Sequence, residues 1–430
     1  MAKILLAAHP SVGHTNALRA IGVQLLSQGH DVSMAMTTIQ LPFINLWPEM
    51  FRVVASLIQN IKDDEIDILP LSLSVSSLLP VIQLPHAKGQ EELKLALRFF
   101  TSDMERQAKQ IAGHIQKWEP DIVVADYLMP AAMLGAKLTV RPYVALYHSA
   151  LPFPVKGAPP FGSGLVDVDP DSEEWAKAKM KHKELFGFFD SQVQQCAKRL
   201  GIKAVYKSLL EKPISNDLNL LITAAELEPG LFPLAGPVVM TGPCFQQAKT
   251  IEQDEPALVA FHGEMTRAYI SLGTVLNGQT HVFKSILDAI ATFDIQAVVS
   301  AGASFNKLSP LINSRTHIFR YVPQTALLPL VDIVITHGGN NTVQETLFAG
   351  KPMIVIPFGS DQIVNAQRVE KIGVGVSIPF FELNKASLCQ AIKKVMKPDM
   401  IERARILGSS LQQHDGTEIA TSAILNLATK

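Results

Sequence analysis

One segment limits the fold more than any other part of the chain: residues 321–367, which hold two short apolar runs separated by a helix-like stretch. The runs are Asp332–Thr336 and Met353–Pro357, and both are rich in the Val and Ile that buried strands favour. Between them, Thr-His-Gly-Gly-Asn-Asn-Thr is a glycine turn whose polar residues open a helix. Two strands joined by one helix form a parallel crossover, so the segment predicts an open α/β sheet whose strand ends form a ligand crevice.

The same alternation of strand and helix runs through both halves of the chain. Its spacing predicts parallel, doubly wound sheets with right-handed crossovers. We therefore expect an α/β protein with two Rossmann-like domains that face each other across a cleft. The predicted strands are Lys3–Ala8, Asp31–Met36, Ile122–Ala125, Tyr143–Tyr147, Leu220–Thr223, Val238–Met240, Ala268–Leu272, Ile295–Ser300 and His317–Tyr321, and the predicted helices include Ala17–Ser27, Ala131–Leu138 and His281–Ala291.

The domain boundaries follow from where the pattern stops and restarts. Residues 246–255, QQAKTIEQDE, are polar, lack periodicity and follow a Gly-Pro turn. The sequence predicts an N-terminal domain over residues 1–245, a linker over 246–258 and a C-terminal domain over 259–412. Residues 413–430 form a last helix, which we expect to pack back on the N-terminal domain.

Composition excludes several classes of protein. Apolar residues make up 47 % of the 430 residues, and 38 basic residues nearly balance 39 acidic ones, so no basic surface for nucleic acid is indicated. Three widely spaced cysteines predict neither a disulfide framework nor a metal site, and they favour a reducing compartment. The uncharged stretch Ile68–Pro85 contains three prolines and four serines, so we expect loops and buried turns there. The alternative is a surface that contacts lipid or a lipophilic ligand.

A candidate base lies near the N-terminus. Gly13 and His14 follow the first strand. Gly13 allows close approach of the backbone and is a candidate donor-binding residue. A helix start disfavours the charged imidazolium of His14, as a general base near neutral pH requires. Asp126 ends the strand at 122–125 and could orient His14, as the acidic member of a Ser-His-Asp triad does. The alternatives are a capping histidine and a helix N-cap aspartate. The chain has no GxSxG, HExxH, GxxxxGK[ST] or early GxGxxG motif.

A candidate diphosphate site lies in the C-terminal half. Ser271 and Thr274 follow a buried strand where small residues let backbone N–H groups approach an anion. The second turn offers more hydrogen-bonding groups, and the helix dipole adds favourable potential. A glycine-rich turn that merely caps a core helix is the alternative. This turn and its helix contain His337, Gly339, Asn340, Asn341, Thr342 and Glu345, the last of which could accept both hydroxyls of a ribose.

A carboxylate beside an amide follows the second strand of the opening segment. Asp361 and Gln362 together offer the acceptors and donors that sugar hydroxyls need. The same position also suits a helix N-cap, so position alone leaves the two interpretations open.

These motifs resemble those of the family 1 UDP-dependent glycosyltransferases, which have the two-domain GT-B fold. The family's aromatic-small-Pro-Gln motif matches Tyr321-Val322-Pro323-Gln324, although plant members have Trp where Tyr321 and Asn340 stand. The HGGNNT form is similar to the bacterial branch that glycosylates macrolides and carotenoids. The resemblance implies that Tyr321 stacks on uracil, Val322 pairs with its edge, Gln324 contacts the base or ribose and Ser149 lies near the sugar. It further implies phosphate contacts from His337, Asn341 and Thr342, ribose binding by Glu345, sugar binding by Asp361 and Gln362, and a His14–Asp126 catalytic pair.

The resemblance implies an inverting enzyme that moves a hexose, expected to be glucose, from a UDP-sugar to a hydroxyl of a small lipophilic acceptor. Flavonoids and other phenolics, macrolides and terpenoids all fit, as in secondary metabolism or detoxification, and apolar loops at 69–84 and 151–160 would contact them. We expect no metal cofactor, no nucleic-acid partner, no membrane span and a cytoplasmic location. The alternatives are a sugar-nucleotide epimerase or hydrolase of the same fold, and an inactive UDP-sugar-binding partner of another enzyme. A glycoside hydrolase lacks the required carboxylate pair.

Overall fold

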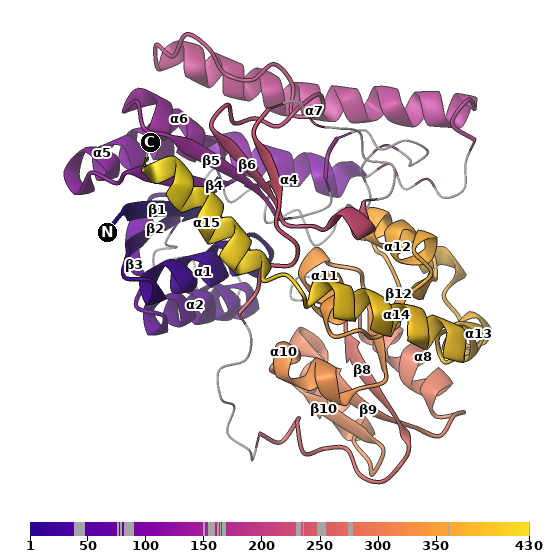
Figure 1. The fold of residues 1–430 in the computed structure, drawn as a ribbon. Helices are drawn as coiled ribbons and strands as arrows, with labels where there is room; N and C mark the ends of the chain where they lie inside the picture. Colours follow the sequence, from indigo (N-terminus) through magenta and orange to yellow (C-terminus); the bar gives the residue numbers. More distant parts are fainter. Residues whose placement is uncertain are drawn as a thin grey trace. The chain divides into compact units, whose positions relative to one another are not determined.

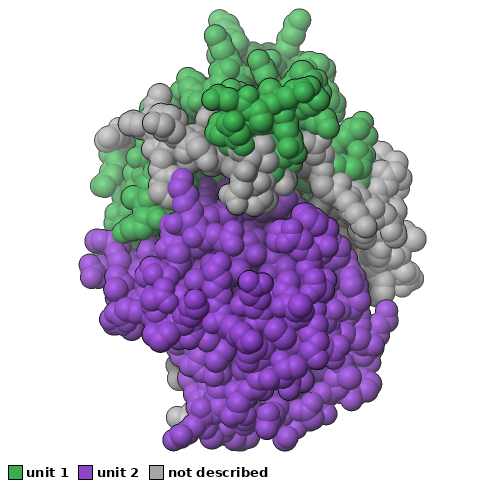
Figure 2. All heavy atoms as spheres, turned by 90° about the vertical axis from the view of Figure 1, so that its right-hand side faces the viewer, with its two compact units in different colours: residues 1–245, 415–430 green, residues 246–414 purple. Residues whose placement is uncertain are grey.

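The computed structural model divides into two compact units, residues 1–245 with 415–430 and residues 246–414 (Figures 1 and 2). It describes the chain except for residues 38–47, 75–76, 78–79, 81–89, 149–150, 154–159, 161–162, 164, 166–168, 229–233, 235, 247–254, 274–277, 360 and 430. For residues 48–53, 90 and 92–93 it describes the backbone alone. Most of the predicted linker, the loop at 154–159, Ser149 and Thr274 therefore lie outside the described residues.

Unit 1 is built on a seven-stranded parallel sheet with the order β3-β2-β1-β4-β5-β6-β7. Its strands are nearly continuous apolar runs, as expected for a parallel sheet covered on both faces. The strands are β1 (Lys3–Ala8), β2 (Asp31–Thr37), β3 (Asp67–Leu71), β4 (Ile122–Asp126), β5 (Tyr143–Tyr147), β6 (Leu218–Leu221) and β7 (Val238–Met240). The helices are α1 (Val12–Ser27), α2 (Pro48–Asp63), α4 (Gln90–Ser102), α5 (Met104–Trp118), α6 (Pro130–Leu138), α7 (Glu173–Arg199) and α15 (Gly416–Ala428).

The last helix belongs to unit 1 although it follows unit 2 in the sequence. In Figure 1, α15 (yellow) runs beside α1 (indigo), and Ala420 and Ile424 are part of the core that α1 forms with β1, β2 and β4. Asp415 caps the start of α15, since its carboxylate accepts hydrogen bonds from the backbone N–H groups of Thr417 and Glu418 at 2.9 and 3.1 Å. The helices α5 and α6 cover the opposite face of the sheet (Figure 1).

Unit 2 repeats the plan with a six-stranded parallel sheet in the order β10-β9-β8-β11-β12-β13. The helices α8 and α13 form one core with the sheet, and α11 packs against α14. The fold-class prediction of two parallel α/β sheets is confirmed. The strands are β8 (Thr266–Ser271), β9 (Ile295–Ser300), β10 (Thr316–Phe319), β11 (Ile333–Thr336), β12 (Met353–Val355) and β13 (Gly375–Ser377), and the helices are α8 (Thr280–Ile290), α9 (Phe305–Leu308), α10 (Gln324–Leu327), α11 (Asn340–Phe348), α12 (Asp361–Lys371), α13 (Lys385–Val395) and α14 (Pro398–Leu411).

Two sequence-based predictions of local structure are wrong. Residues 67–71, whose last four residues were expected to lie in a loop, form β3, and Pro70 is tolerated because β3 is an edge strand whose prolyl nitrogen need not donate to a further strand. The predicted acceptor loop at 69–84 therefore begins in the sheet. The first helix begins at Val12 and not at Ala17, because the carbonyl of Ser11 accepts the backbone N–H groups of His14 and Thr15.

No helix in the described part of the chain combines the length and apolar character needed to cross a bilayer.

Candidate active site

Each sheet has one point where the strand order reverses, and four of the predicted site residues lie at these two points. In unit 1 the reversal lies between β1 and β4, and in unit 2 between β8 and β11. Loops leaving neighbouring strands in opposite directions open a crevice at such a point, where α/β proteins bind ligands. His14 follows β1 and Asp126 ends β4, while Ser271 ends β8 and His337 follows β11.

The structure brings the two residues of the predicted catalytic pair together. The Nδ1 atom of His14 hydrogen-bonds Oδ2 of Asp126. The His14 side chain keeps 16 % of its surface exposed, whereas that of Asp126 is fully buried. Asp126 is not the N-cap of α6, because Met129 occupies that position. The carboxylate therefore holds the inner nitrogen of an imidazole whose other nitrogen remains available for a substrate.

Two more histidines surround this pair, and the sequence analysis missed both. His148 follows β5, and its Nδ1 lies 3.2 Å from Oδ1 of Asp126. His9 follows β1, and its Nε2 hydrogen-bonds the carbonyl of Leu128 at 3.2 Å. A signal was available in the sequence, since each is a polar residue directly after a predicted parallel strand, as Asp126 was.

The electrostatics of the cluster favour an ionised Asp126. Burial by itself raises the pKa of this carboxyl, but the charges of His148 and His14 outweigh burial and hold the pKa well below its usual range. The backbone N–H of Leu128 also donates to Oδ1 at 2.9 Å. His9 behaves differently, because burial lowers its pKa to about 4 and keeps it neutral at pH 7. Asp126 is thus a fixed negative charge beside His14.

His14, Asp126 and His148 offer ligand atoms within 4.8 Å of one another, close enough for a metal ion. Both oxygens of Asp126, however, are already in contact with ring nitrogens. We interpret the cluster as a carboxylate held between two imidazoles.

An aromatic wall lies beside His14. The ring centroid of Phe100, near the end of α4, is 5.3 Å from that of His14 and 4.7 Å from that of His9. Phe99 lies 5.6 Å from His9, and both phenylalanines are only partly buried. A flat apolar group could pack against these rings while its hydroxyl faces His14.

In unit 2 the glycine turn holds His337 closely. Gly338 has φ +89°, a conformation that favours glycine, and Asn365 of α12 donates to its carbonyl at 2.9 Å. A Cβ atom on Gly339 would lie 2.6 Å from Nε2 of His337, and one on Gly273 would lie 2.5 Å from it. Burial lowers the pKa of His337 to about 4, so the ring is neutral at pH 7. The turn leads into α11, where Asn340, Asn341 and Thr342 form the first turn.

A hydrogen-bonded chain leads from Tyr269 to Glu345, which lies one turn further along α11. The hydroxyl of Tyr269 donates to Oε1 of Gln324 at 2.9 Å, and Nε2 of Gln324 donates to Glu345 at 2.5 Å and lies 3.4 Å from the Thr342 hydroxyl. Burial raises the pKa of Glu345 to about 7, and the hydrogen bond from Gln324 opposes this only in part. This carboxyl lacks a cationic partner in the chain described here, so a ligand's hydroxyl groups would stabilise its charged form.

The remaining predicted donor-site residues lie near the ends of β10 and β12. Tyr321 follows β10 with 51 % of its surface exposed, so its ring is accessible for stacking, and Val322 is partly buried. Asp361 is the first residue of α12 and not its N-cap. Gln362 accepts the backbone N–H of Phe358 at 2.9 Å through Oε1, which fixes its amide.

Comparison with known proteins identifies the family to which the chain belongs. The description "UDP-glucoronosyl and UDP-glucosyl transferase" names a family whose sequence model matches residues 3–418. The chain belongs to this glycosyltransferase family. The predicted resemblance is therefore confirmed, and the enzyme class with it.

Two relatives from Bacillus subtilis show how the similarity is spread along this glycosyltransferase. The uncharacterized UDP-glucosyltransferase YojK is 30 % identical over 264 residues, which cover 59 % of the chain and 64 % of YojK. The uncharacterized UDP-glucosyltransferase YdhE is 25 % identical over 404 residues, which cover 93 % of the chain and 91 % of YdhE. The alignment with YojK thus spans just under two thirds of that relative.

A solved structure confirms the GT-B fold of this glycosyltransferase. The glycotransferase of kitacinnamycin superimposes with a TM-score of 0.72 over 99 % of both chains, at 19 % sequence identity. At that identity the match concerns the fold alone.

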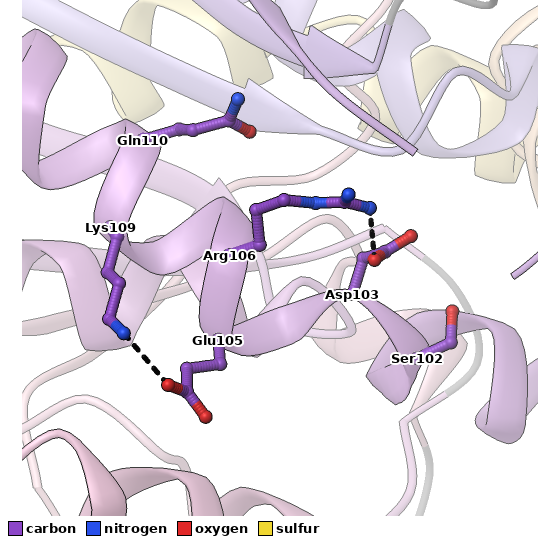
Figure 3. A pocket seen from close by; sticks show the side chains of 6 residues that line it. All are labelled: Ser102, Asp103, Glu105, Arg106, Lys109 and Gln110. Carbon is purple, nitrogen blue, oxygen red and sulfur yellow. Dashed lines mark hydrogen bonds and ion pairs between the residues drawn. The ribbon is translucent and has the colours of Figure 1, made fainter. Parts of the chain in front are cut away.

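A separate cavity of about 570 Å³ lies where α4 passes into α5 (Figure 3). It is lined by Ser102, Asp103, Glu105, Arg106, Lys109 and Gln110. Arg106 pairs with Asp103, and Lys109 pairs with Glu105 at 2.9 Å. Because the charges neutralise one another and no residue of the histidine cluster lines the cavity, we do not assign the reaction to it.

Proposed function

We propose that the enzyme transfers a hexose, with glucose as the first candidate, from a UDP-sugar to a hydroxyl group of a small lipophilic acceptor, with inversion at the anomeric carbon. The observation that carries this proposal is the His14–Asp126 pair at the point where the sheet order of unit 1 reverses. The family and the two glucosyltransferase relatives support the donor. The partly exposed Phe99 and Phe100 support an apolar acceptor.

His14 acts as the general base in this proposal. An ionised carboxylate only accepts hydrogen bonds, so the contact with Asp126 places the imidazole proton on Nδ1 and leaves Nε2 to take the acceptor's hydroxyl proton. The charge that then develops on the ring is stabilised by Asp126, whose lowered pKa keeps it ionised. The acceptor oxygen attacks the anomeric carbon from the side opposite the departing diphosphate.

The first turn of α11 stabilises the leaving UDP. Backbone N–H groups at a helix start and the positive end of the helix dipole both favour a diphosphate, with Asn341, Thr342 and the neutral His337 adding hydrogen-bonding groups. We propose that Glu345 accepts the ribose hydroxyls, that Tyr321 stacks on the base, and that Asp361 and Gln362 contact the sugar. The proposal needs no metal ion, because these groups neutralise the diphosphate.

Replacement of the base tests the proposal. We expect His14→Ala to lower transfer to a neutral alcohol by roughly 10²–10⁴-fold, because general base catalysis is lost. Binding of UDP, measured by calorimetry, should not change, since the residues proposed to hold the UDP part of the donor lie in unit 2. Unchanged turnover would contradict the assignment of His14.

A matrix of UDP-sugars and acceptors, with products identified by mass spectrometry, identifies the substrates. The coupling constant of the product's anomeric proton reports the stereochemistry: a UDP-α-glucose donor must give a β-glucoside if the reaction inverts. An α-glucoside would refute inversion, and sugar release without any acceptor would favour the hydrolase alternative.

A further inference from the structure

Tyr269 is a buried tyrosine of unit 2 that has no role in the proposed function. It lies within β8 with 1 % of its surface exposed. Its neighbours Ala268 and Ile270 belong to the core that the sheet forms with α8 and α13. Because side chains alternate along a strand, the Tyr269 ring faces the other side of the sheet, where its hydroxyl meets Gln324 of α10. The fold therefore places this hydroxyl beside the proposed donor site.

The hydroxyl of Tyr269 holds the Gln324 amide in one orientation. Burial raises the pKa of Tyr269 above its ordinary value, so the hydroxyl keeps its proton and donates it to Oε1 of Gln324. The NH₂ group of an amide has no acceptor to offer in place of that oxygen. It therefore turns toward α11, where it donates to Oε2 of Glu345 at 2.5 Å and lies 3.4 Å from the hydroxyl oxygen of Thr342.

The amide in turn fixes the carboxyl group of Glu345. Gln324 contacts Oε2, and the described part of the chain makes no hydrogen bond to Oε1. Two neighbouring hydroxyls of a ribose need a carboxylate that is held at a set angle, because both must point at its oxygens at the same time. A single hydroxyl makes a smaller demand, since it can follow a carboxylate that turns. A fixed carboxylate thus favours a ligand that presents two hydroxyls.

We propose that Tyr269 is a positioning residue of the donor site, which acts through Gln324 and makes Glu345 distinguish a ribonucleotide from a 2′-deoxyribonucleotide. The inference rests on the proposed role of Glu345 as the acceptor of the ribose hydroxyls. Tyr269 does not touch the donor. It keeps the carboxylate in the orientation that accepts the 2′- and 3′-hydroxyls together, and without its hydroxyl the oxygen of the Gln324 amide loses its partner in β8.

The test compares the dissociation constants of UDP and 2′-deoxy-UDP, measured by calorimetry at pH 8. The two ligands carry the same base and diphosphate, so the ratio of their Kd values isolates the 2′-hydroxyl. At pH 8 Glu345 is above its pKa of about 7 and is ionised. Tyr269→Phe removes the hydroxyl and keeps the ring. Tyr147→Phe is the matched control, because it removes a buried hydroxyl of unit 1 that accepts the backbone N–H of Ile214 at 2.9 Å.

We expect the unsubstituted protein to bind UDP about tenfold more tightly than 2′-deoxy-UDP, as one hydrogen bond to a charged group implies. The ratio should fall below about threefold in Tyr269→Phe, chiefly because UDP binds more weakly, and should stay at about tenfold in Tyr147→Phe. A ratio in Tyr269→Phe equal to that of the unsubstituted protein would overturn the proposal. An equal fall in the control would also overturn it.

A second variant separates positioning from a general loss of stability. Gln324→Ala removes the amide through which Tyr269 acts, so the ratio should again fall below about threefold. Adding Tyr269→Phe to Gln324→Ala should not weaken UDP binding further, because the effects of residues in one chain of contacts do not add. Further weakening would show that Tyr269 acts by another route. If Tyr269→Phe loses its fold, Gln324→Ala carries the test, and an unchanged ratio in that variant overturns the proposal.

These measurements also separate the role of Tyr269 from the proposed function. If the unsubstituted protein does not bind UDP, the proposed donor is wrong. If it binds UDP and 2′-deoxy-UDP equally, Glu345 does not accept the 2′-hydroxyl, and the inference fails with that assignment. If it distinguishes the two ligands and Tyr269→Phe does so to the same extent, the role of Tyr269 alone is wrong.

Discussion

Asp126 at the end of β4 and Glu345 in α11 are both buried carboxyls, yet their pKa values shift in opposite directions. Burial raises both pKa values, so burial does not explain the difference. Asp126 has two imidazoles and a backbone N–H, whereas Glu345 has the neutral amide of Gln324. Asp126 is therefore a permanent charge, while the charge of Glu345 depends on pH and on bound hydroxyl groups.

The largest expected effect comes from removing the permanent charge. We expect Asp126→Asn to lower kcat by roughly 10²–10⁴-fold, because an amide cannot stabilise protonated His14. Glu105→Gln is the control: it changes a half-exposed carboxylate of unit 1 that lines the separate cavity, and kcat should stay within about twofold of the unsubstituted enzyme. Steady-state kinetics measures both. A large loss of kcat in the Glu105→Gln control would indicate that the separate cavity takes part in the reaction.

The charge of Glu345 should make donor affinity depend on pH. The free carboxyl has a pKa of about 7, and ribose hydroxyls stabilise only its ionised form. Binding therefore releases a proton below pH 7, and the Kd for UDP-glucose should fall about tenfold from pH 6 to pH 8 and level off above that range. UDP-glucose suits the calorimetric measurement because its diphosphate diester does not titrate there. A flat profile would show that Glu345 does not bind the donor in its ionised form.

Glu345→Gln is the control for the pH dependence of the Kd for UDP-glucose, and it also provides a stability test. The variant should bind UDP-glucose more weakly, with no pH dependence from this position. The folded carboxyl keeps its proton up to about pH 7, while the unfolded one ionises near its ordinary value of 4.5, so stability falls as pH rises between these values. Since glutamine removes this cost, we expect a higher Tm for the free variant at pH 8. A lower Tm would contradict the sign of the shift.

A smaller effect, on KM for the UDP-sugar, is expected from adding a side chain at Gly339, which packs against the His337 ring. In Gly339→Ala the new Cβ would lie 2.6 Å from Nε2 of His337 and must displace the ring. We expect KM for the UDP-sugar to rise about fivefold, which corresponds to about 1 kcal/mol, with little change in kcat. Gly278→Ala meets nothing within 4 Å and is the control in the same unit. If both variants have the same kinetic constants, His337 does not contribute to donor binding.

The smallest effect should be that of metal removal. Donors at the start of α11 can neutralise the diphosphate without a cation. Incubation with EDTA followed by gel filtration should therefore leave initial rates unchanged, and added Mg²⁺ should not raise them. A loss on chelation that Mg²⁺ restores would contradict the proposed metal-independent site.

Much of the architecture could be predicted because apolar runs of five or six residues, separated by amphipathic stretches, permit few folds. The bounds of β1 and β5 were predicted without error. The sequence did not predict β3, since Pro70 argues against a strand unless the strand is known to lie at an edge. It also placed His14 in a loop, because the bond that starts α1 early is a backbone contact that no side-chain pattern records.

One part of the candidate site could likewise be predicted from the sequence, and another part could not. Residues 336–345 are local in sequence, so their glycine turn, helix start and hydrogen-bonding groups could be predicted together. The cluster around Asp126 is not local: its members lie at or just after the ends of three strands that are far apart in the sequence, β1, β4 and β5, and strand order decides that these ends meet.

The amino-acid pattern alone predicts two parallel sheets, the glycosyltransferase resemblance and a candidate donor segment, because periodicity and local motifs are carried by consecutive residues. The folded structure adds that His148 and His14 both contact Asp126, and that the pKa values of Asp126 and Glu345 shift in opposite directions. Local patterns do not record these features, because a carboxyl's charge depends on burial and on the groups that face it, and the packing of distant segments places those groups.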